Sequence, residues 1–307
     1  MSWRNVMVDD GDHLKVYLDN AEIHKGENKY VIPLSDIGII VLDGMATSIT
    51  TRLLAACSTY NVVLVICDKK HIPCGMYIPF YQHSRTVKMV RKQVQWGENV
   101  KDKLWEKIIK YKIHNQSEVL YHFTKNEEKY IQLQNYITDV LPGDTSNREG
   151  HAAKVYFNTI FGNEFSKGND CIENAMLNYG YAIIRAYITR AIVSYGYNPS
   201  LGIFHKSEYN SFCLADDFLE IFRPVIDAYV INYLLESDEE TKFLSQEVRA
   251  YLIGILSFRV KFDNQYQKIS TVIDKFVLRC FDYLDPEKEQ ENQILNFKIS
   301  TLEGIKK

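Results

Sequence analysis

The segment 171–195 constrains the fold most, because it is apolar on nearly all sides when its residues are spaced as a helix. A helix of this kind must be buried, either in the core of a large domain or in a membrane. Its apolar run also contains Asn178, Arg185 and Arg190, which are costly in hydrocarbon. We therefore predict a buried helix at the centre of a helical domain and no membrane span.

The chain after this helix contains a histidine and a group of carboxylates. His205 comes shortly after the end of the helix, and the acidic group follows it. The group consists of Asp216, Asp217 and Glu220. If 214–225 is a helix, these carboxylates share one face opposite an apolar stripe, and Pro224 kinks that helix or begins a new one. The ordinary explanation of such a face is exposure to solvent, so a functional site needs further evidence.

Residues 4–78 have the pattern of a strand-rich region. The expected strands are 6–8, 14–18, 22–24, 30–34, 37–42 and 62–67. Short strands joined by tight turns predict antiparallel pairing, and the helical spacing of 48–60 before the last strand predicts one crossover connection. Because this region has no cluster of reactive side chains, its simplest interpretation is a folding and dimerisation module.

From about residue 85 the pattern becomes helical. The later helices are expected at 127–140, 243–258 and 267–284, with a charged break at 236–240 and a charged, mobile tail from Asp285. The sequence therefore predicts an α+β fold. Its parts are a β-rich domain at 1–78, with antiparallel strands and one crossover helix, a linker at 79–84, and a larger all-α domain at 85–307.

The net charge of −3 over 307 residues gives no overall attraction to nucleic acid or to an anionic membrane. A local basic patch is nevertheless expected at the start of the helical region. It comprises Arg85, Lys88, Arg91 and Lys92, followed by lysines at 101, 103, 107, 110 and 112. Lysines are common on solvated helix faces, but such a row also attracts a DNA backbone through phosphate contacts.

Two further features indicate the cellular compartment. The six cysteines include no CxxC pair, which argues against a zinc knuckle, a redox site or a disulfide scaffold. The N-terminal residues contain no apolar secretory segment. Together these features predict reduced thiols in a cytoplasmic protein.

Glu149 lies in the first turn of a helix that Asp144 or Ser146 can cap. A glutamate there is ordinarily explained by the helix dipole. One imidazole with several carboxylates would, however, suit Mg²⁺ or Mn²⁺, whereas the lack of a Cys ligand or a second His disfavours structural zinc. Phosphodiester chemistry is the natural use of such a metal, although spacing alone does not bring these residues together.

Several blocks of the sequence resemble one known family. They are SWRNVMV, VVLVICDKKHIP, REGHAAKVYF, ENAMLNYGYAIIRAYITRAIVSYGYNPSLGIFH and LADDFLEIFRPVID. They resemble the CRISPR-associated adaptation integrase, also called the universal CRISPR-associated endonuclease ("Cas-one"). The resemblance covers almost the whole chain. The sequences of these blocks are most similar to those of members from type II systems.

The resemblance implies a metal site in the helical domain. It matches the family's metal-ligating Glu to Glu149, its His to His205, and its acidic ligand to Glu220, where many members carry Asp. Asp217 matches a second acidic position near the site, whose role stays open. DNA backbones would be held by residues of the basic patch and, nearer the site, by Arg148 and Arg223.

The resemblance also implies a reaction and partners. Members insert a captured DNA fragment into a repeat array by attack of a 3′-hydroxyl on a phosphodiester, in which the metal activates the hydroxyl or His205 transfers a proton. They dimerise through the β region and assemble on double-stranded DNA with a small companion adaptation protein as a hetero-hexamer, joined by further type II CRISPR proteins. Two alternatives stay open: an architectural DNA-binding subunit without catalysis, and a metal-dependent phosphohydrolase of small nucleotides.

Overall fold

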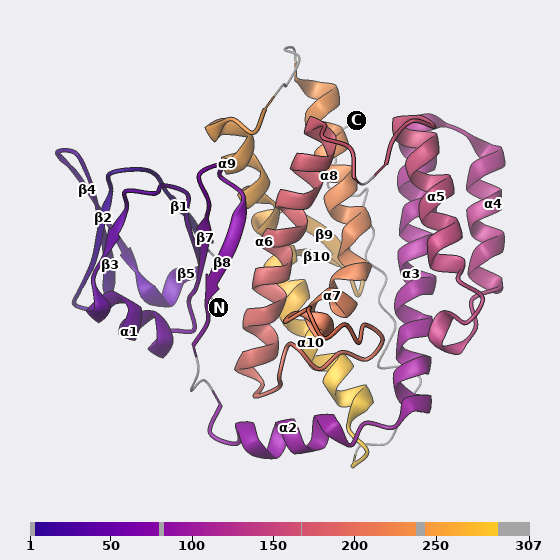
Figure 1. Ribbon diagram of the computed structural model, residues 1–307, viewed down its shortest axis with the longest axis horizontal. Helices are drawn as coiled ribbons and strands as arrows, with labels where there is room; N and C mark the ends of the chain where they lie inside the picture. Colours follow the sequence, from indigo (N-terminus) through magenta and orange to yellow (C-terminus); the bar gives the residue numbers. More distant parts are fainter. Residues whose placement is uncertain (1–3, 80–82, 167, 238–242, 288–307) are drawn as a thin grey trace.

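The protein, seen in a computed structural model, has a strand-rich N-terminal part beside a larger helical part (Figure 1). The structure describes residues 4–79, 83–166, 168–237 and 243–287. Residues 80–82 of the predicted linker, 238–240 of the charged break and the tail beyond residue 287 therefore lie outside the described residues. The predicted α+β fold class is confirmed.

Two four-stranded sheets form the N-terminal part, with α1 (Thr51–Thr59) packed against them. One sheet has the order β1 (Arg4–Val8), β5 (Ile37–Leu42), β7 (Val63–Cys67) and β8 (Pro73–Tyr77). The other has the order β4 (Asn28–Pro33), β3 (Asn20–Lys25), β2 (His13–Tyr17) and β6 (Ser48–Ile49). The predicted strands are thus present, and they are divided between two layers.

The prediction of antiparallel pairing is wrong for three strands of the first sheet, although β7 and β8 do pair antiparallel. β1 pairs with β5, and β5 with β7, in parallel. The reason is that β2, β3 and β4 pair with one another in the second sheet, so the strands next in sequence are not neighbours of β1. The predicted crossover is present, because α1 joins the parallel strands β5 and β7.

The first sheet is buried on both faces. Ile40 and Leu64 point into a small core that the two sheets share with α1. Their neighbours Ile39, Val41 and Val63 point the other way, into the main core with the helices. This alternation with a period of two explains why the continuous apolar runs of β5 and β7 form internal parallel strands.

The helical part is arranged around α6 (Ile172–Ser194), the long apolar helix predicted from the sequence. The others are α2 (Thr86–Val94), α3 (Glu98–Thr124), α4 (Glu127–Thr138), α5 (Arg148–Phe161), α7 (Cys213–Leu219), α8 (Arg223–Glu236), α9 (Gln246–Gly254) and α10 (Ile269–Leu284). Helix α2 crosses one end of this bundle, and α3 packs against α4, α5 and α8 (Figure 1). Within the described ranges, none of the helices combines the length and apolar character that a membrane crossing requires.

The second part is not all-α as predicted, because it contains a β-hairpin. The strands β9 (Arg259–Phe262) and β10 (Gln265–Lys268) pair antiparallel between α9 and α10. Asp263 and Asn264 form the turn, and both have positive φ values, 51° and 62°. Asp and Asn tolerate this conformation well, so the Asp-Asn pair was the available hairpin signal.

The predicted helix 214–225 is divided into three pieces. Helix α7 ends at Leu219, a short 3₁₀ turn covers Glu220–Phe222, and α8 begins at Arg223 with Pro224 in its first turn. This confirms that Pro224 begins a new helix, since its missing N–H has no intrahelical partner there. The break gives Asp217 and Glu220 different environments.

Candidate active site

Glu149 projects from the start of α5, where the helix is held by Asp144. The two carboxylate oxygens of Asp144 accept the backbone N–H groups of Arg148 and Glu149, each at 2.9 Å. Asp144 therefore satisfies two donors of the first turn and is the cap, rather than Ser146. About a third of the Glu149 side chain stays exposed, so this carboxylate is accessible from solvent.

Glu220 is a buried carboxylate with two cationic partners. Its residue exposure is 5%, which excludes the solvated face that helical spacing predicted. The Lys112 ammonium donates to Glu220 Oε2 at 2.5 Å, and Arg223 Nε donates to Glu220 Oε1 at 2.7 Å. Both oxygens of Glu220 thus face a cation.

The Lys112 ammonium also donates to Glu149 Oε1, so one cation joins the two predicted carboxylate ligands. We call Lys112, Glu149, Glu220 and Arg223 the ion cluster. Lys112 comes from α3 and is only 2% exposed. The cluster thereby brings together residues from α3, α5, the 3₁₀ turn and α8.

The pKa values within the ion cluster follow from this pairing. Burial alone would raise the pKa of Glu220, but the charges and hydrogen bonds of Lys112 and Arg223 outweigh burial and lower it to about 2. Burial would likewise lower the pKa of Lys112, and the two carboxylates raise it instead. Both groups are therefore held in their charged forms.

His205 is held by Asp217, which is fully buried. Oδ1 of Asp217 lies 2.6 Å from Nδ1 of the ring and accepts the backbone N–H of His205 at 3.0 Å. Oδ2 accepts the N–H groups of Ile203 and Phe204 at 2.6 and 3.1 Å. The hydrogen bond to Asp217 is the main cause of the raised pKa of His205, and the charge of Glu220 adds to it.

The ring of His205 lies between aromatic residues and a pocket. It packs edge-on against Trp105 of α3 and against Phe204, which stack on each other. A pocket of about 360 Å³ is lined by His205, by Lys101 and by the end of α2 at Gln93 and Val94. Substrate can therefore approach His205 from the side of α2.

The structure brings two of the three predicted metal ligands together. Glu149 and Glu220 converge on one ammonium, whereas His205 interacts with Asp217. Among the residues that the structure describes, no three His, Cys, Asp or Glu side chains lie close enough together to hold a metal ion. The two carboxylates that converge on the Lys112 ammonium nevertheless present oxygen donors of the kind that Mg²⁺ or Mn²⁺ prefers.

The predicted basic patch is only partly a free surface. Arg85, which precedes α2, and Lys88 and Arg91 within α2 are exposed. Lys92 instead lies 3.2 Å from Asp285 and 2.7 Å from Glu287. The patch is therefore narrower than the sequence pattern indicated.

The two basic residues expected nearer the site are also paired. Arg148 lies 3.6 Å from Asp139, and Arg223 belongs to the ion cluster. Lys112 was expected on the basic surface and is instead buried, so that expectation is wrong. The signal for its burial was its helical position, because it follows the buried residues Trp105 and Ile108 by seven and four positions.

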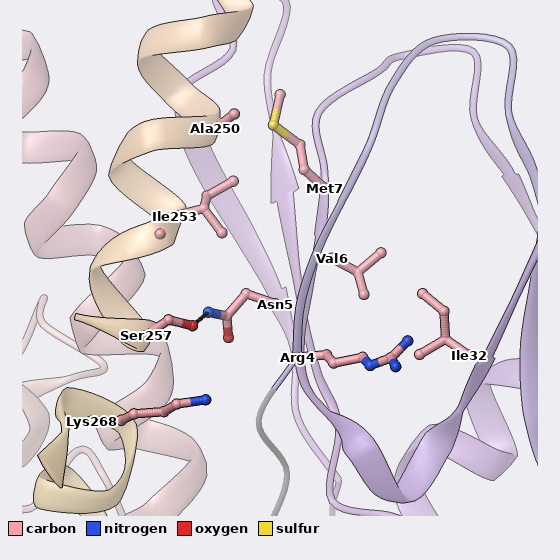
Figure 2. Close-up of a pocket in the computed structure, with 10 residues that line it drawn as sticks. Arg4, Asn5, Val6, Met7, Ile32, Ala250, Ile253, Ser257 and Lys268 are labelled. Carbon is pink, nitrogen blue, oxygen red and sulfur yellow. Dashed lines mark hydrogen bonds between the residues drawn. The ribbon is translucent and has the colours of Figure 1, made fainter. Parts of the chain in front are cut away.

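A second pocket lies between the two parts of the chain, away from the ion cluster. Figure 2 shows it between β1 and α9, lined by Asn5, Met7, Ile253 and Lys268 among others, with a volume of about 610 Å³. Its lining contains neither a carboxylate nor a histidine. This pocket therefore offers no carboxylate or imidazole that could hold a metal ion.

The chain is similar to known proteins over most of its length. The model of the family described as "CRISPR associated protein Cas1" matches residues 6–254. The "CRISPR-associated endonuclease Cas1" of Neisseria meningitidis serogroup C (strain 8013) is 35% identical over 277 residues, covering 90% of each chain.

Solved structures share the fold. A "Casposase bound to integration product" is 18% identical with a TM-score of 0.73, covering 95% of each chain. A "Cas6-RT-Cas1–Cas2 complex" is 18% identical with a TM-score of 0.74, covering 93% of this chain and 35% of that one. At these identities the likeness concerns the fold.

Proposed function

The chain belongs to the CRISPR-associated protein Cas1 family, and we infer from this membership that it is a DNA endonuclease and integrase of CRISPR adaptation. The structural observation that carries the proposal for its active site is the convergence of Glu149 and Glu220 on one cation. The pKa of His205 is raised mainly by its hydrogen bond to Asp217, and the charge of Glu220 adds to this effect, which supports including the imidazole in the proposed site. Perturbed groups of this kind are typical of catalytic sites.

We propose strand transfer as the reaction. The 3′-hydroxyl of an incoming DNA strand attacks a phosphodiester of the repeat, so one P–O bond forms and the bond to the leaving 3′-oxygen breaks. The attacking hydroxyl loses a proton and the leaving oxygen gains one. Because one phosphodiester replaces another, no nucleoside triphosphate is needed, and water in place of the hydroxyl gives the endonuclease reaction.

We propose that Glu149, Glu220 and His205 hold a divalent cation, Mg²⁺ or Mn²⁺. When bound, this cation would stabilise the negative charge that develops on the phosphoryl oxygens. Arg223 keeps Glu220 ionised and fixes its Oε1, so that Oε2 faces Glu149. Asp217 fixes the His205 ring through Nδ1, which leaves Nε2 to bind or to move a proton.

We propose that double-stranded DNA runs along α2. Lys88 and Arg91 are exposed on this helix and Arg85 just before it, and the C-terminal end of the helix lines the pocket at His205. These cations would hold phosphates without reading bases. The partners would be a second copy of the chain, bound through the β region, and a small companion adaptation protein in a hetero-hexamer, with further type II proteins guiding it.

The test is strand transfer of a short labelled duplex into a supercoiled plasmid that carries a leader and repeat, with the companion protein and Mn²⁺ present. We expect joined product from wild type, and a loss of about 100-fold or more for Glu220→Gln and for His205→Ala. DNA binding should be largely kept in both variants. Glu247→Gln, which changes an exposed glutamate of α9, is the matched control and should join normally.

Three results would contradict the proposed site. Normal joining by Glu220→Gln and His205→Ala would mean that the residues are misassigned. Normal joining by Glu149→Ala would instead favour the architectural role, in which this chain only positions DNA. Equal loss of joining and of DNA binding would indicate that the residues are structural.

A further inference from the structure

Lys112 occupies an unusual position for a lysine. It lies on the inner face of α3, one turn beyond Ile108 and two beyond Trp105, and all three residues are at most 2% exposed. A buried ammonium is costly unless it is paired and hydrogen-bonded. Its place is therefore explained by its two partners, Glu149 and Glu220.

The two cations of the ion cluster bind different carboxylate oxygens. Arg223 binds the outer oxygen of Glu220, Oε1, at 2.7 Å. Lys112 binds the other oxygen, Oε2, together with Oε1 of Glu149. The ammonium thus lies at the point on which one oxygen of each carboxylate converges.

We propose that Lys112 is the resident counter-ion of Glu149 and Glu220, and that a divalent cation of the Mg²⁺ or Mn²⁺ class binds these carboxylates by displacing its ammonium. This inference rests on the proposed function, because it concerns the same metal ligands. In this proposal Lys112 is neither a DNA-binding residue of the basic patch nor a metal ligand.

Charge balance favours displacement of the Lys112 ammonium over binding of a divalent cation beside it. The ion cluster contains two carboxylates and two cations, so its formal charges cancel. A divalent cation added with the ammonium in place would leave two uncompensated positive charges in a largely buried site, at a high desolvation cost. Displacement of the flexible lysine side chain avoids part of this cost, and the exposed side of Glu149 offers a path outward.

The arrangement has a clear consequence for the metal-free protein. Without Lys112, the carboxylates of Glu149 and Glu220 would face each other, and like charges repel. With Lys112 between them, they are held close together before metal arrives. The cost is a weaker metal affinity, because each binding event must break the two lysine contacts.

The test measures Mn²⁺ binding by calorimetry on metal-free protein, without DNA. We expect Lys112→Met to bind Mn²⁺ about tenfold tighter than wild type or more, because no ammonium has to be displaced. Its Tm should be lower than that of wild type in EDTA and should rise further on adding Mn²⁺. Lys110→Met is the matched control, since Lys110 is on the same helix and pairs only locally with Glu106 at 2.6 Å.

A second variant keeps the test decisive if Lys112→Met does not fold. Lys112→Gln is neutral but its amide can donate to a carboxylate, and it should also bind Mn²⁺ more tightly than wild type. Equal affinities in wild type and both Lys112 variants, abolished by Glu220→Gln, would overturn the displacement and leave the metal site intact. No Mn²⁺ binding in any of these proteins would overturn the metal site itself.

Discussion

Asp217 holds His205 by both its ring and its backbone. One oxygen of the buried carboxylate lies 2.6 Å from Nδ1 of the imidazole and 3.0 Å from the backbone nitrogen of the same residue. The other oxygen binds the two preceding N–H groups. We therefore propose that Asp217 is a positioning residue for His205, a role that the sequence left open.

Asp217→Asn should misplace His205 while keeping the size of the side chain. The amide has only one acceptor oxygen, so at least one of the backbone N–H groups loses its partner, at about 1–3 kcal/mol. We expect a lower Tm, reduced strand transfer, and a changed tautomer of His205 in the ¹⁵N shifts of its ring. Asp216→Asn, in which the neighbouring carboxylate bound to Asn210 is changed, should leave the tautomer unaltered. An unaltered His205 tautomer in Asp217→Asn would contradict the positioning role.

Gly202→Ala should disturb the same loop by a different route. A Cβ at Gly202 would lie 2.4 Å from the carbonyl oxygen of His205 and 2.7 Å from Oδ2 of Asp217, so the loop must move. We expect a loss of stability of about 1–3 kcal/mol, measured by denaturant unfolding, with reduced strand transfer. Gly97→Ala is the matched control, because a Cβ there meets nothing within 4 Å. Equal stability of the two variants would show that the loop adapts freely.

Lys88→Ala should weaken DNA binding more than Lys92→Ala. Lys88 is exposed, whereas Lys92 is already paired with Asp285 and Glu287. Loss of one phosphate contact should reduce the slope of log K against log salt by about 0.9. The slopes are measured by fluorescence anisotropy with a labelled duplex. A larger change of slope for Lys92→Ala than for Lys88→Ala would indicate that DNA does not run along the exposed face of α2.

The sequence predicted local structure better than long-range pairing. The central helix, the cap at Asp144 and the new helix at Pro224 follow from neighbouring residues, and all three are present. The parallel pairing of β1 with β5 depends on which strands meet in space, so strand patterns could not predict it. The same holds for the buried ion pair of Asp43 with Arg249, 2.7 Å apart, which joins the two parts of the chain.

In the candidate site, too, local features were predicted better than long-range contacts. Glu149, His205, Asp217 and Glu220 were named from sequence, but the contacts that each of them makes were not predicted. Lysine spacing along α3 suggested a solvated face, and one of these lysines is buried because Glu149 and Glu220 approach from other helices. The position of Lys112 on the apolar stripe of α3 was the sequence signal for its burial. Its contacts with Glu149 and Glu220 in the folded protein explain why a lysine lies there.

Glu220→Gln should make the free energy of unfolding fall less steeply as the pH is lowered. The pKa of Glu220 is lowered to about 2, because the charges of Lys112 and Arg223 outweigh the effect of burial, against 4.5 for an ordinary glutamate. A lowered folded-state pKa contributes stability that is fully present above pH 4.5 and is lost as the pH falls toward 2. The contribution at neutral pH is about 3 kcal/mol.

The measurement is the free energy of unfolding from pH 6 down to pH 3 in EDTA, so that no metal competes for the carboxylates. Wild type should lose stability steadily below pH 4.5, whereas Glu220→Gln should be less stable at pH 6 but decline less steeply, because it has one fewer proton to take up on unfolding. Glu27→Gln, at an exposed position between β3 and β4, should leave the steepness close to that of wild type. Parallel curves for wild type and Glu220→Gln would mean that Lys112 and Arg223 do not hold Glu220 ionised, and the account of the ion cluster would then be wrong.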